Sequence, residues 1–155
     1  MIIILDDVLA DDDIDRIKTN SGKYNSEFQG LYQWSVLQIF YPLIKQATKY
    51  YSLHTCIGYE VWEQKNSRPP NWHYDRDEVL AKKGILKFPI CTLVYYIEVN
   101  NLIGGKLLIE NGVDISPVGN RLIIFGPSVK HYVEEFSGYR HSLIINPWSN
   151  FLGQE

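Results

Sequence analysis

The part of the sequence after residue 54 constrains the fold most strongly. From there, short runs rich in β-branched and aromatic residues alternate with Gly, Pro and Asn. Such runs are typical of strands, and the residues between them are typical of turns. This pattern predicts a mainly β structure, with strands at residues 55–63, 71–75, 88–99, 105–110, 121–125, 131–136 and 139–148.

The first 54 residues carry helix signals instead. Residues 2–5 predict a short strand, and residues 11–18 predict a helix with acidic residues at its start, where the helix dipole favours them. Apolar residues recur at helical spacing from Trp34 to Tyr51. Pro42 lacks the N–H that a helix interior needs, so the main helix is predicted to start there, at residues 42–50.

Two helices followed by about seven or eight closely spaced strands predict a double-stranded β-helix, which is a jelly roll with a cupin-like architecture. No linker or repeat divides the sequence. We therefore expect one domain over residues 1–155, in which residues 1–54 give helical support and residues 55–148 form the jelly-roll core.

Composition narrows the functional classes. The net charge of -3 and the lack of a basic run argue against nucleic acid as a partner. The apolar start at residues 1–5 is too short for a signal-peptide core, and no apolar run approaches the length of a membrane span. Cys56 and Cys91 lie within apolar stretches, which favours buried free thiols over a disulfide. We expect a cytoplasmic protein without a membrane partner.

His73 and Asp75 stand two residues apart, so in a strand both side chains would project from one face. A third candidate ligand, His131, comes much later. If Ser137-Gly138 forms a two-residue hairpin turn, His131 lies opposite Ile144. Arg140 would then share the face of His131, about 13 Å away along the sheet at ~3.3 Å per residue.

Two histidines and one carboxylate that leave other metal positions open are typical of non-haem iron(II) oxygenases. A structural zinc site needs four filled positions, which the two cysteines are not spaced to supply, and zinc hydrolysis is a secondary alternative. Asp77 could replace Asp75 only if the strand continued, and residues 76–78 indicate a strand exit.

Residues 72–148 resemble the catalytic core of the 2-oxoglutarate- and iron(II)-dependent oxygenases, most closely the prolyl 4-hydroxylase-like branch. The matching features, in chain order, are His73-x-Asp75, the strand Thr92 to Ile97, Gly104-Gly105-x-Leu107, Pro117-x-Gly119-x-Arg121 with Phe125, His131, and Gly138-x-Arg140-x-Ser142. One departure is a tyrosine that commonly precedes the first histidine; here Trp62 aligns best, with Tyr59 as second choice.

This resemblance implies that His73, Asp75 and His131 bind iron(II) and that Arg140 pairs with the distal carboxylate of 2-oxoglutarate. It implies that Tyr96 and Ser142 hydrogen-bond the same cosubstrate. It further implies ascorbate as an auxiliary cofactor, dioxygen as a substrate, release of succinate and carbon dioxide, and hydroxylation of an unactivated C–H bond.

Several alternatives stay open. The acceptor is a peptide or protein in a prolyl-hydroxylase-like reaction, or a free amino acid or small metabolite. A non-catalytic metal-containing jelly-roll module is a third reading, against which Arg140 argues. The charged segment from Arg76 to Gly84 is either a lid over the acceptor or a solvated connection. We expect Trp72 and Tyr74 to face away from the site and pack against the N-terminal helices.

Overall fold

The computed structural model describes residues 1–23, 27–30, 34–69 and 71–155, with no side-chain description over 27–30 and 34–37. In chain order its elements are β1 (Ile2–Leu5), α1 (Asp11–Thr19), β2 (Glu27–Gly30), α2 (Trp34–Ala47), β3 (Gly58–Lys65), α3 (Glu78–Ala81), β4 (Thr92–Gly104), β5 (Leu107–Ile109), β6 (Asp114–Ile115), β7 (Leu122–Phe125), β8 (His131–Val133) and β9 (Phe136–Trp148).

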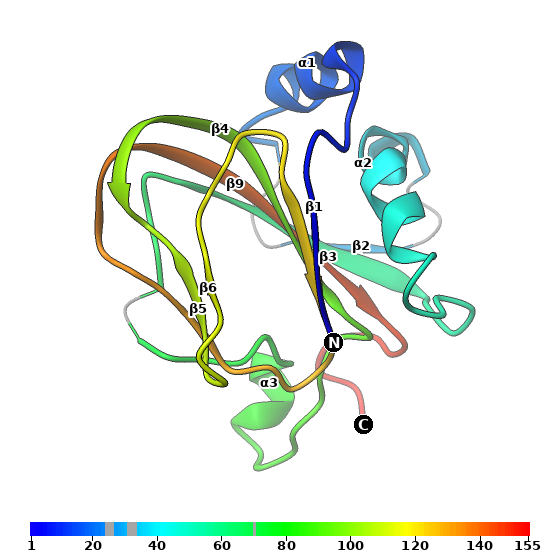
Figure 1. The fold of residues 1–155 in the computed structure, drawn as a ribbon. Helices are drawn as coiled ribbons and strands as arrows, with labels where there is room; N and C mark the ends of the chain where they lie inside the picture. The colour runs from blue at the N-terminus through cyan, green and yellow to red at the C-terminus, as the bar shows by residue number, and fades with distance from the viewer. Residues whose placement is uncertain (24–26, 31–33, 70) are drawn as a thin grey trace.

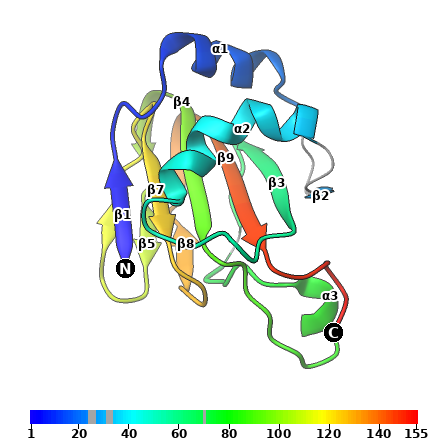
Figure 2. The same ribbon diagram turned by 90° about the vertical axis from the view of Figure 1, so that its right-hand side faces the viewer.

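The strands form two antiparallel sheets. The major sheet has the order β1-β7-β4-β9-β3-β2, and the minor sheet has the order β6-β5-β8. Helices α1 and α2 cover one face of the major sheet, and the minor sheet lies on its other side (Figures 1 and 2). The predicted mainly β jelly roll is confirmed.

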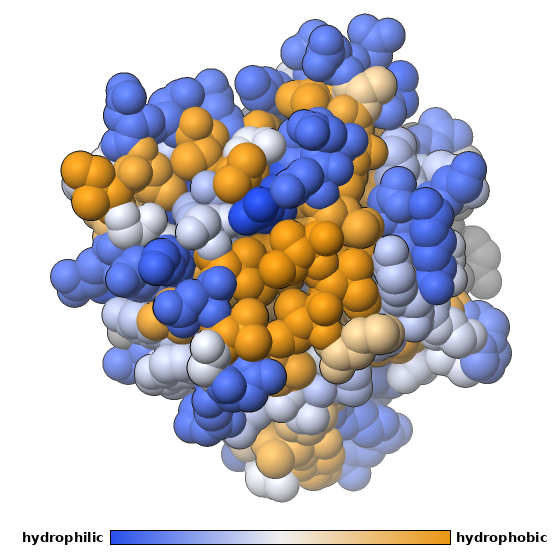
Figure 3. Space-filling view, viewed as in Figure 1, coloured by the Kyte–Doolittle hydropathy of each residue, from blue (hydrophilic) through white to orange (hydrophobic). Residues whose placement is uncertain are grey.

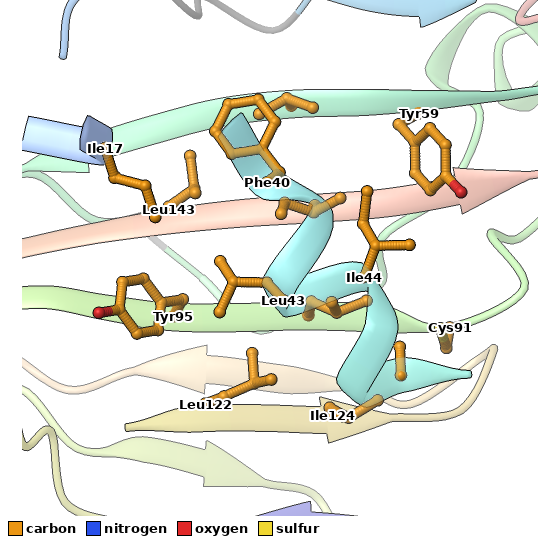
Figure 4. Close-up of a cluster of buried hydrophobic side chains, with 14 of the residues drawn as sticks. Ile17, Phe40, Leu43, Ile44, Tyr59, Cys91, Tyr95, Leu122, Ile124 and Leu143 are labelled. Atoms are coloured by element: carbon orange, nitrogen blue, oxygen red, sulfur yellow. The ribbon is translucent and has the colours of Figure 1, made fainter. Parts of the chain in front are cut away.

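Alternate residues of the major sheet serve two different purposes, because successive side chains of a strand point to opposite faces. One set packs against α1 and α2, as Figure 4 shows for Phe40, Leu43 and Ile44 of α2 lying over the strands. The other set faces the minor sheet and includes Val94, Tyr96 and Ile144. The sheet therefore separates a helix-side core from a space between the two sheets, where the site lies.

The predicted start of the main helix at residue 42 is wrong. Helix α2 begins at Trp34 and contains Pro42 in its interior. A proline there removes one backbone hydrogen bond. The helix nevertheless buries Phe40, Leu43 and Ala47 completely, each at 0% exposure, so burial on both sides of the proline outweighs that loss.

The predicted hairpin at Ser137-Gly138 is also wrong. Residues 131–133 pair with β5 in the minor sheet, whereas residues 136–148 form one continuous strand between β4 and β3. Gly138 has φ +98° and lies opposite an irregular part of β4, where a Cβ would come within 2.2 Å of the Asn101 carbonyl oxygen. The glycine permits this close approach of two strands and does not form a turn.

The predicted strand at 71–75 is reduced to one isolated bridge between His73 and His131. Trp72 is not a core residue: it is 44% exposed and stacks on Tyr132 at 5.7 Å between ring centroids. Tyr74 contacts Phe88 in an edge-to-face arrangement and lines a cavity beside the site. Neither packs against the N-terminal helices, because residues 71–75 lie on the minor-sheet side.

Strand β1 forms an end of the major sheet, and the space-filling view shows apolar residues gathered in the middle of the face that carries it (Figure 3). Cys56 and Cys91 are buried free thiols, as predicted. None of the helices in the described ranges is long and apolar enough to cross a membrane.

Candidate metal centre

The structure brings His73, Asp75 and His131 together between the two sheets. Their candidate ligand atoms all lie within 4.8 Å of one another. The Asp75 Oδ1 atom is 4.0 Å from His73 Nε2 and 3.7 Å from His131 Nε2. His73 and His131 also exchange two backbone hydrogen bonds, of 3.0 and 2.9 Å, which fix their relative position despite the distance between them in sequence.

Both imidazole rings are oriented in the same way. His73 Nδ1 lies 3.0 Å from the Asn71 carbonyl oxygen, and His131 Nδ1 lies 2.9 Å from the Val129 carbonyl oxygen. When each Nδ1–H donates to its carbonyl, each Nε2 presents a lone pair toward Asp75, which is how metal-binding histidines are commonly held. Burial lowers the pKa of His131, and the Asp75 carboxylate only partly opposes this, so the neutral form that a metal requires is favoured.

Asp75 is positioned by Thr92, the first residue of β4. The Thr92 hydroxyl donates to Asp75 Oδ2 at 2.9 Å, which leaves Oδ1 toward the histidines. Asp77 lies outside this group. Its carboxylate accepts from the backbone N–H groups of Val79, Leu80 and Gly153 and caps α3.

This donor set fits a divalent transition metal. Two neutral imidazoles and one carboxylate match the ligands that iron(II) takes in oxygenases, and positions for small ligands stay open. No fourth His, Cys, Asp or Glu joins the cluster in the described residues, so the set differs from that of a closed structural zinc site.

A cavity extends from the triad between the two sheets. Its lining combines the three triad residues with Arg140 and apolar or amide side chains, namely Trp62, Gln64, Pro69, Val94, Leu107, Val133 and Ile144. Thus Arg140 shares a cavity with His131, as the sequence predicted. The reason differs, since the two residues come from facing sheets and not from neighbouring strands.

Arg140 is a buried cation without a carboxylate partner in the described part of the chain. It is 1% exposed, its guanidinium donates to Ser142 Oγ at 3.3 Å, and its Nε has no hydrogen-bond partner. The Tyr96 ring lies 5.2 Å away and the Phe136 ring 5.8 Å away. A buried guanidinium held in this way can grip a carboxylate through paired hydrogen bonds.

Tyr96 and Ser142 support Arg140 and do not line the cavity themselves. Both are 0% exposed, and the Tyr96 hydroxyl makes no hydrogen bond of normal geometry within the described ranges. Burial raises the pKa of Tyr96, and the charge of Arg140 opposes that shift, so the phenol stays protonated and able to donate. Their predicted hydrogen bonds to the cosubstrate stay predictions.

A second cavity opens on the other side of the triad. It shares Trp62, Gln64, Pro69, His73 and Asp75 with the first cavity and adds Glu60, Tyr74, Arg76, Glu78 and Asn146. Trp62 therefore lines both cavities. Tyr59, the second choice for the aligned aromatic residue, packs in the helix-side core instead.

The remaining histidines lie elsewhere. His141 is buried on the helix side of β9, where its Nε2 is 3.5 Å from a Glu63 carboxylate oxygen. His54 contacts the Ser52 hydroxyl. Sequence reasoning assigned no role to Thr92, Pro69 or Gln64; only Thr92 carried a signal, since it begins the stretch Thr92 to Ile97 that matches the oxygenases.

Comparisons with known proteins were made by sequence and by structure. No protein-family model matches the sequence, and no curated protein matches it. Among solved structures, the chain is similar to a prolyl-4-hydroxylase from Pseudomonas putida, with 18% identity and a TM-score of 0.65 over 95% of this chain and 84% of that one. It is similar to a 2OG-Fe(II) oxygenase family protein from Burkholderia pseudomallei, with 9% identity and a TM-score of 0.68 over 99% and 89% of the two chains.

A third similar structure is a prolyl hydroxylase from Trichoplax adhaerens in complex with a hypoxia inducible factor peptide fragment. It has 14% identity and a TM-score of 0.65, over 96% of this chain and 83% of that one. At these identities the comparisons establish a shared fold, and function must be argued from the site.

Proposed function

We propose that this chain is an iron(II)- and 2-oxoglutarate-dependent dioxygenase that hydroxylates an unactivated C–H bond. The observation that carries the proposal is one cavity that holds both a two-histidine, one-carboxylate cluster and a buried arginine with no carboxylate partner among the described residues. The metal cluster alone would fit several reactions. The arginine adds a requirement for an anion, which 2-oxoglutarate meets with its second carboxylate.

His73 Nε2, His131 Nε2 and Asp75 Oδ1 would hold the iron. Arg140 would bind the distal carboxylate, with Ser142 orienting its guanidinium and Tyr96 offering a hydroxyl. Bound iron(II) would supply the coupling of 2-oxoglutarate and dioxygen to C–H oxidation, which gives succinate, carbon dioxide and a hydroxylated acceptor. The apolar walls of the cavity, from Val94, Leu107 and Ile144, would keep bulk water away from the reacting groups.

We propose a peptide or protein acceptor, in a prolyl-hydroxylase-like reaction. Two similar structures are prolyl hydroxylases, one of them with a bound peptide. The second cavity opens beside the triad and is lined by Arg76 and Glu78, so we propose that the acceptor reaches the site next to this segment.

We also propose that residues 1–155 act as one catalytic domain, since α1 and α2 pack on the sheet that carries the site. The two buried free thiols support a reducing compartment such as the cytoplasm.

The test combines metal binding with turnover. Purified protein should bind one iron(II) per chain and release succinate from 2-oxoglutarate in the presence of an acceptor. The single changes His73→Ala, Asp75→Ala and His131→Ala should each abolish most of the metal binding. His54→Ala, a histidine outside the cavity, is the matched control and should bind iron like the parent. Wild-type iron affinity in both His73→Ala and His131→Ala would show that the metal site lies elsewhere.

A further inference from the structure

The second cavity contains a polar pair opposite the arginine end of the site. Glu60 on β3 and Asn146 on β9 are direct partners in the sheet register, and both line this cavity. Asn146 lies six residues along β9 from Arg140, or about 20 Å at ~3.3 Å per residue. The triad lies between, since His73 and Asp75 line both cavities. The pair is therefore placed to contact an acceptor, on the side away from the proposed cosubstrate.

Asn146 is a buried amide whose hydrogen-bonding capacity is largely unused. It is 1% exposed, and within the described ranges neither Oδ1 nor Nδ2 makes a hydrogen bond of normal geometry, although the side chain interacts with the Glu60 carboxylate and partly opposes the rise in its pKa. A buried polar group that is left unpaired destabilises the protein, so such groups need a specific reason. An amide that faces a cavity can satisfy both atoms with a ligand that offers a carbonyl oxygen and an N–H group.

Glu60 adds an acceptor of hydrogen bonds and, when it is ionised, a negative charge. The cavity is lined by the carboxylates of Glu60, Asp75 and Glu78, and its one cationic side chain, Arg76, is held by Glu78 with 3.0 Å between Nε and Oε1. Asp75 belongs to the metal cluster. Among the carboxylates of this lining, Glu60 therefore remains: it belongs neither to the metal cluster nor to an ion pair within the described residues.

We propose that Glu60 and Asn146 recognise an acceptor that carries a cationic amino group next to a carbonyl group. The amino group donates to the Glu60 carboxylate, and the carbonyl oxygen accepts from Asn146 Nδ2. This inference rests on the proposed dioxygenase chemistry and not on the choice of a peptide acceptor, which the turnover experiment below decides. The chemistry is shared by a free amino acid and by the N-terminal residue of a peptide, whereas an internal or N-acylated residue lacks the charged amine.

Binding can be tested without knowing the acceptor side chain, because glycinamide carries both groups and N-acetylglycinamide lacks the charge. The protein is loaded with manganese(II) and 2-oxoglutarate, and their binding is measured first. Broadening of each probe's methylene proton signal by the bound paramagnetic ion then reports binding near the triad. A failure to bind metal and 2-oxoglutarate counts against the proposed function, whereas the probe comparison concerns the amine subsite.

We expect glycinamide to bind at least tenfold more tightly than N-acetylglycinamide. Glu60→Gln should remove this preference, and Asn146→Leu should weaken binding of both probes. Glu110→Gln, which changes a carboxylate outside both cavities that lies 3.8 Å from Lys130, is the control and should keep the preference. Equal affinities of the two probes in the unmodified protein would overturn the proposal, and this result does not depend on any variant folding.

Turnover separates the two sources of the amine. Succinate release by the iron(II) protein is measured with a pool of free amino acids, a pool of short peptides with free N-termini, and the same peptides N-acetylated. Higher release with either of the first two pools than with the third supports the proposal and identifies the source. Release that is as high with N-acetylated peptides as with both other pools contradicts it.

Discussion

Replacing Arg140 with methionine should weaken 2-oxoglutarate binding without lowering the stability of the protein. Arg140 is 1% exposed and has no carboxylate partner in the described chain, so the protein alone bears the cost of burying this charge. Replacing buried charges with apolar side chains of similar volume is often neutral or stabilising. We therefore expect Arg140→Met to leave the stability of the ligand-free protein unchanged or to raise it by up to ~2 kcal/mol.

Cosubstrate binding should suffer in the same variant. A bidentate contact to a carboxylate comprises two hydrogen bonds between charged groups, each contributing roughly 1.5–3 kcal/mol. Their loss amounts to about 3 kcal/mol or more, or at least ~100-fold in affinity at 1.4 kcal/mol per factor of ten. Iron affinity should change little. Within the described residues, the Arg140 guanidinium donates to Ser142 and makes no hydrogen bond or ion pair with His73, Asp75 or His131.

The assay is calorimetric titration of 2-oxoglutarate into anaerobic iron(II) protein, together with denaturant unfolding of the ligand-free form. Arg121→Met is the matched control, because Arg121 lies outside both cavities and pairs with Asp6 at 2.6 and 2.9 Å. The control removes an ion pair that solvent partly screens, so it should lose little stability and should keep its 2-oxoglutarate affinity. If Arg140→Met instead lost stability and bound 2-oxoglutarate like the parent, Arg140 would be a structural residue and the clamp would be refuted.

Three further predictions concern carboxylates around the site. Thr92→Val removes the hydroxyl that donates to Asp75 and should weaken iron binding by ~10-fold or more while the melting temperature changes little, as titration with iron and thermal melts would show. Asp77→Ala should have the opposite effects. It removes the acceptor of three backbone N–H groups, so the free energy of unfolding in urea should fall by about 2 kcal/mol, while iron affinity stays unchanged. Burial, the largest cause, raises the pKa of Glu60 from 4.5 to about 7. Between pH 4.5 and about 7 the Glu60 carboxyl is therefore protonated in the folded protein but ionised in the unfolded chain. Because the folded state binds the extra proton, the free energy of unfolding falls as the pH rises through this window to about 7. In metal-free protein, the free energy of unfolding of Glu60→Gln, measured in urea, should match that of the parent at pH 4 and exceed it by roughly 1–2 kcal/mol at pH 8.

Much of the fold could be predicted because strand periodicity and turn residues are local signals. The strands near residues 2–5, 121–125 and 139–148 and the helix at 11–18 follow such signals closely. The hairpin at Ser137-Gly138 failed because glycine at a positive φ serves equally well in a turn and at a close contact of two strands. Only the partner strand decides between these uses, and its identity is not a local property of the sequence.

The start of helix α2 failed for a similar reason. Pro42 predicts a helix start from its own backbone chemistry, but the apolar residues before and after it continue one helical stripe. The outcome depends on what that stripe packs against. Phe40 lies before the proline and Leu43 after it, and both are buried against the same face of the major sheet. Tertiary packing decided the helix boundary over local propensity.

The candidate site also has a part that could be predicted and a part that could not. His73, Asp75, His131 and Arg140 could be selected from the sequence, because their side-chain types, order and spacing are typical of one kind of metal site. Glu60 and Asn146 could not, because their pairing depends on the register of β3 against β9. A shift of one residue would turn Tyr59 or Val61 toward the cavity and bury Glu60 in the apolar helix-side core. That core, which holds Tyr59, Val61, Leu143 and Ile145, therefore fixes the register. It follows that the apolar face of the major sheet determines which polar side chains can meet the acceptor on its other face.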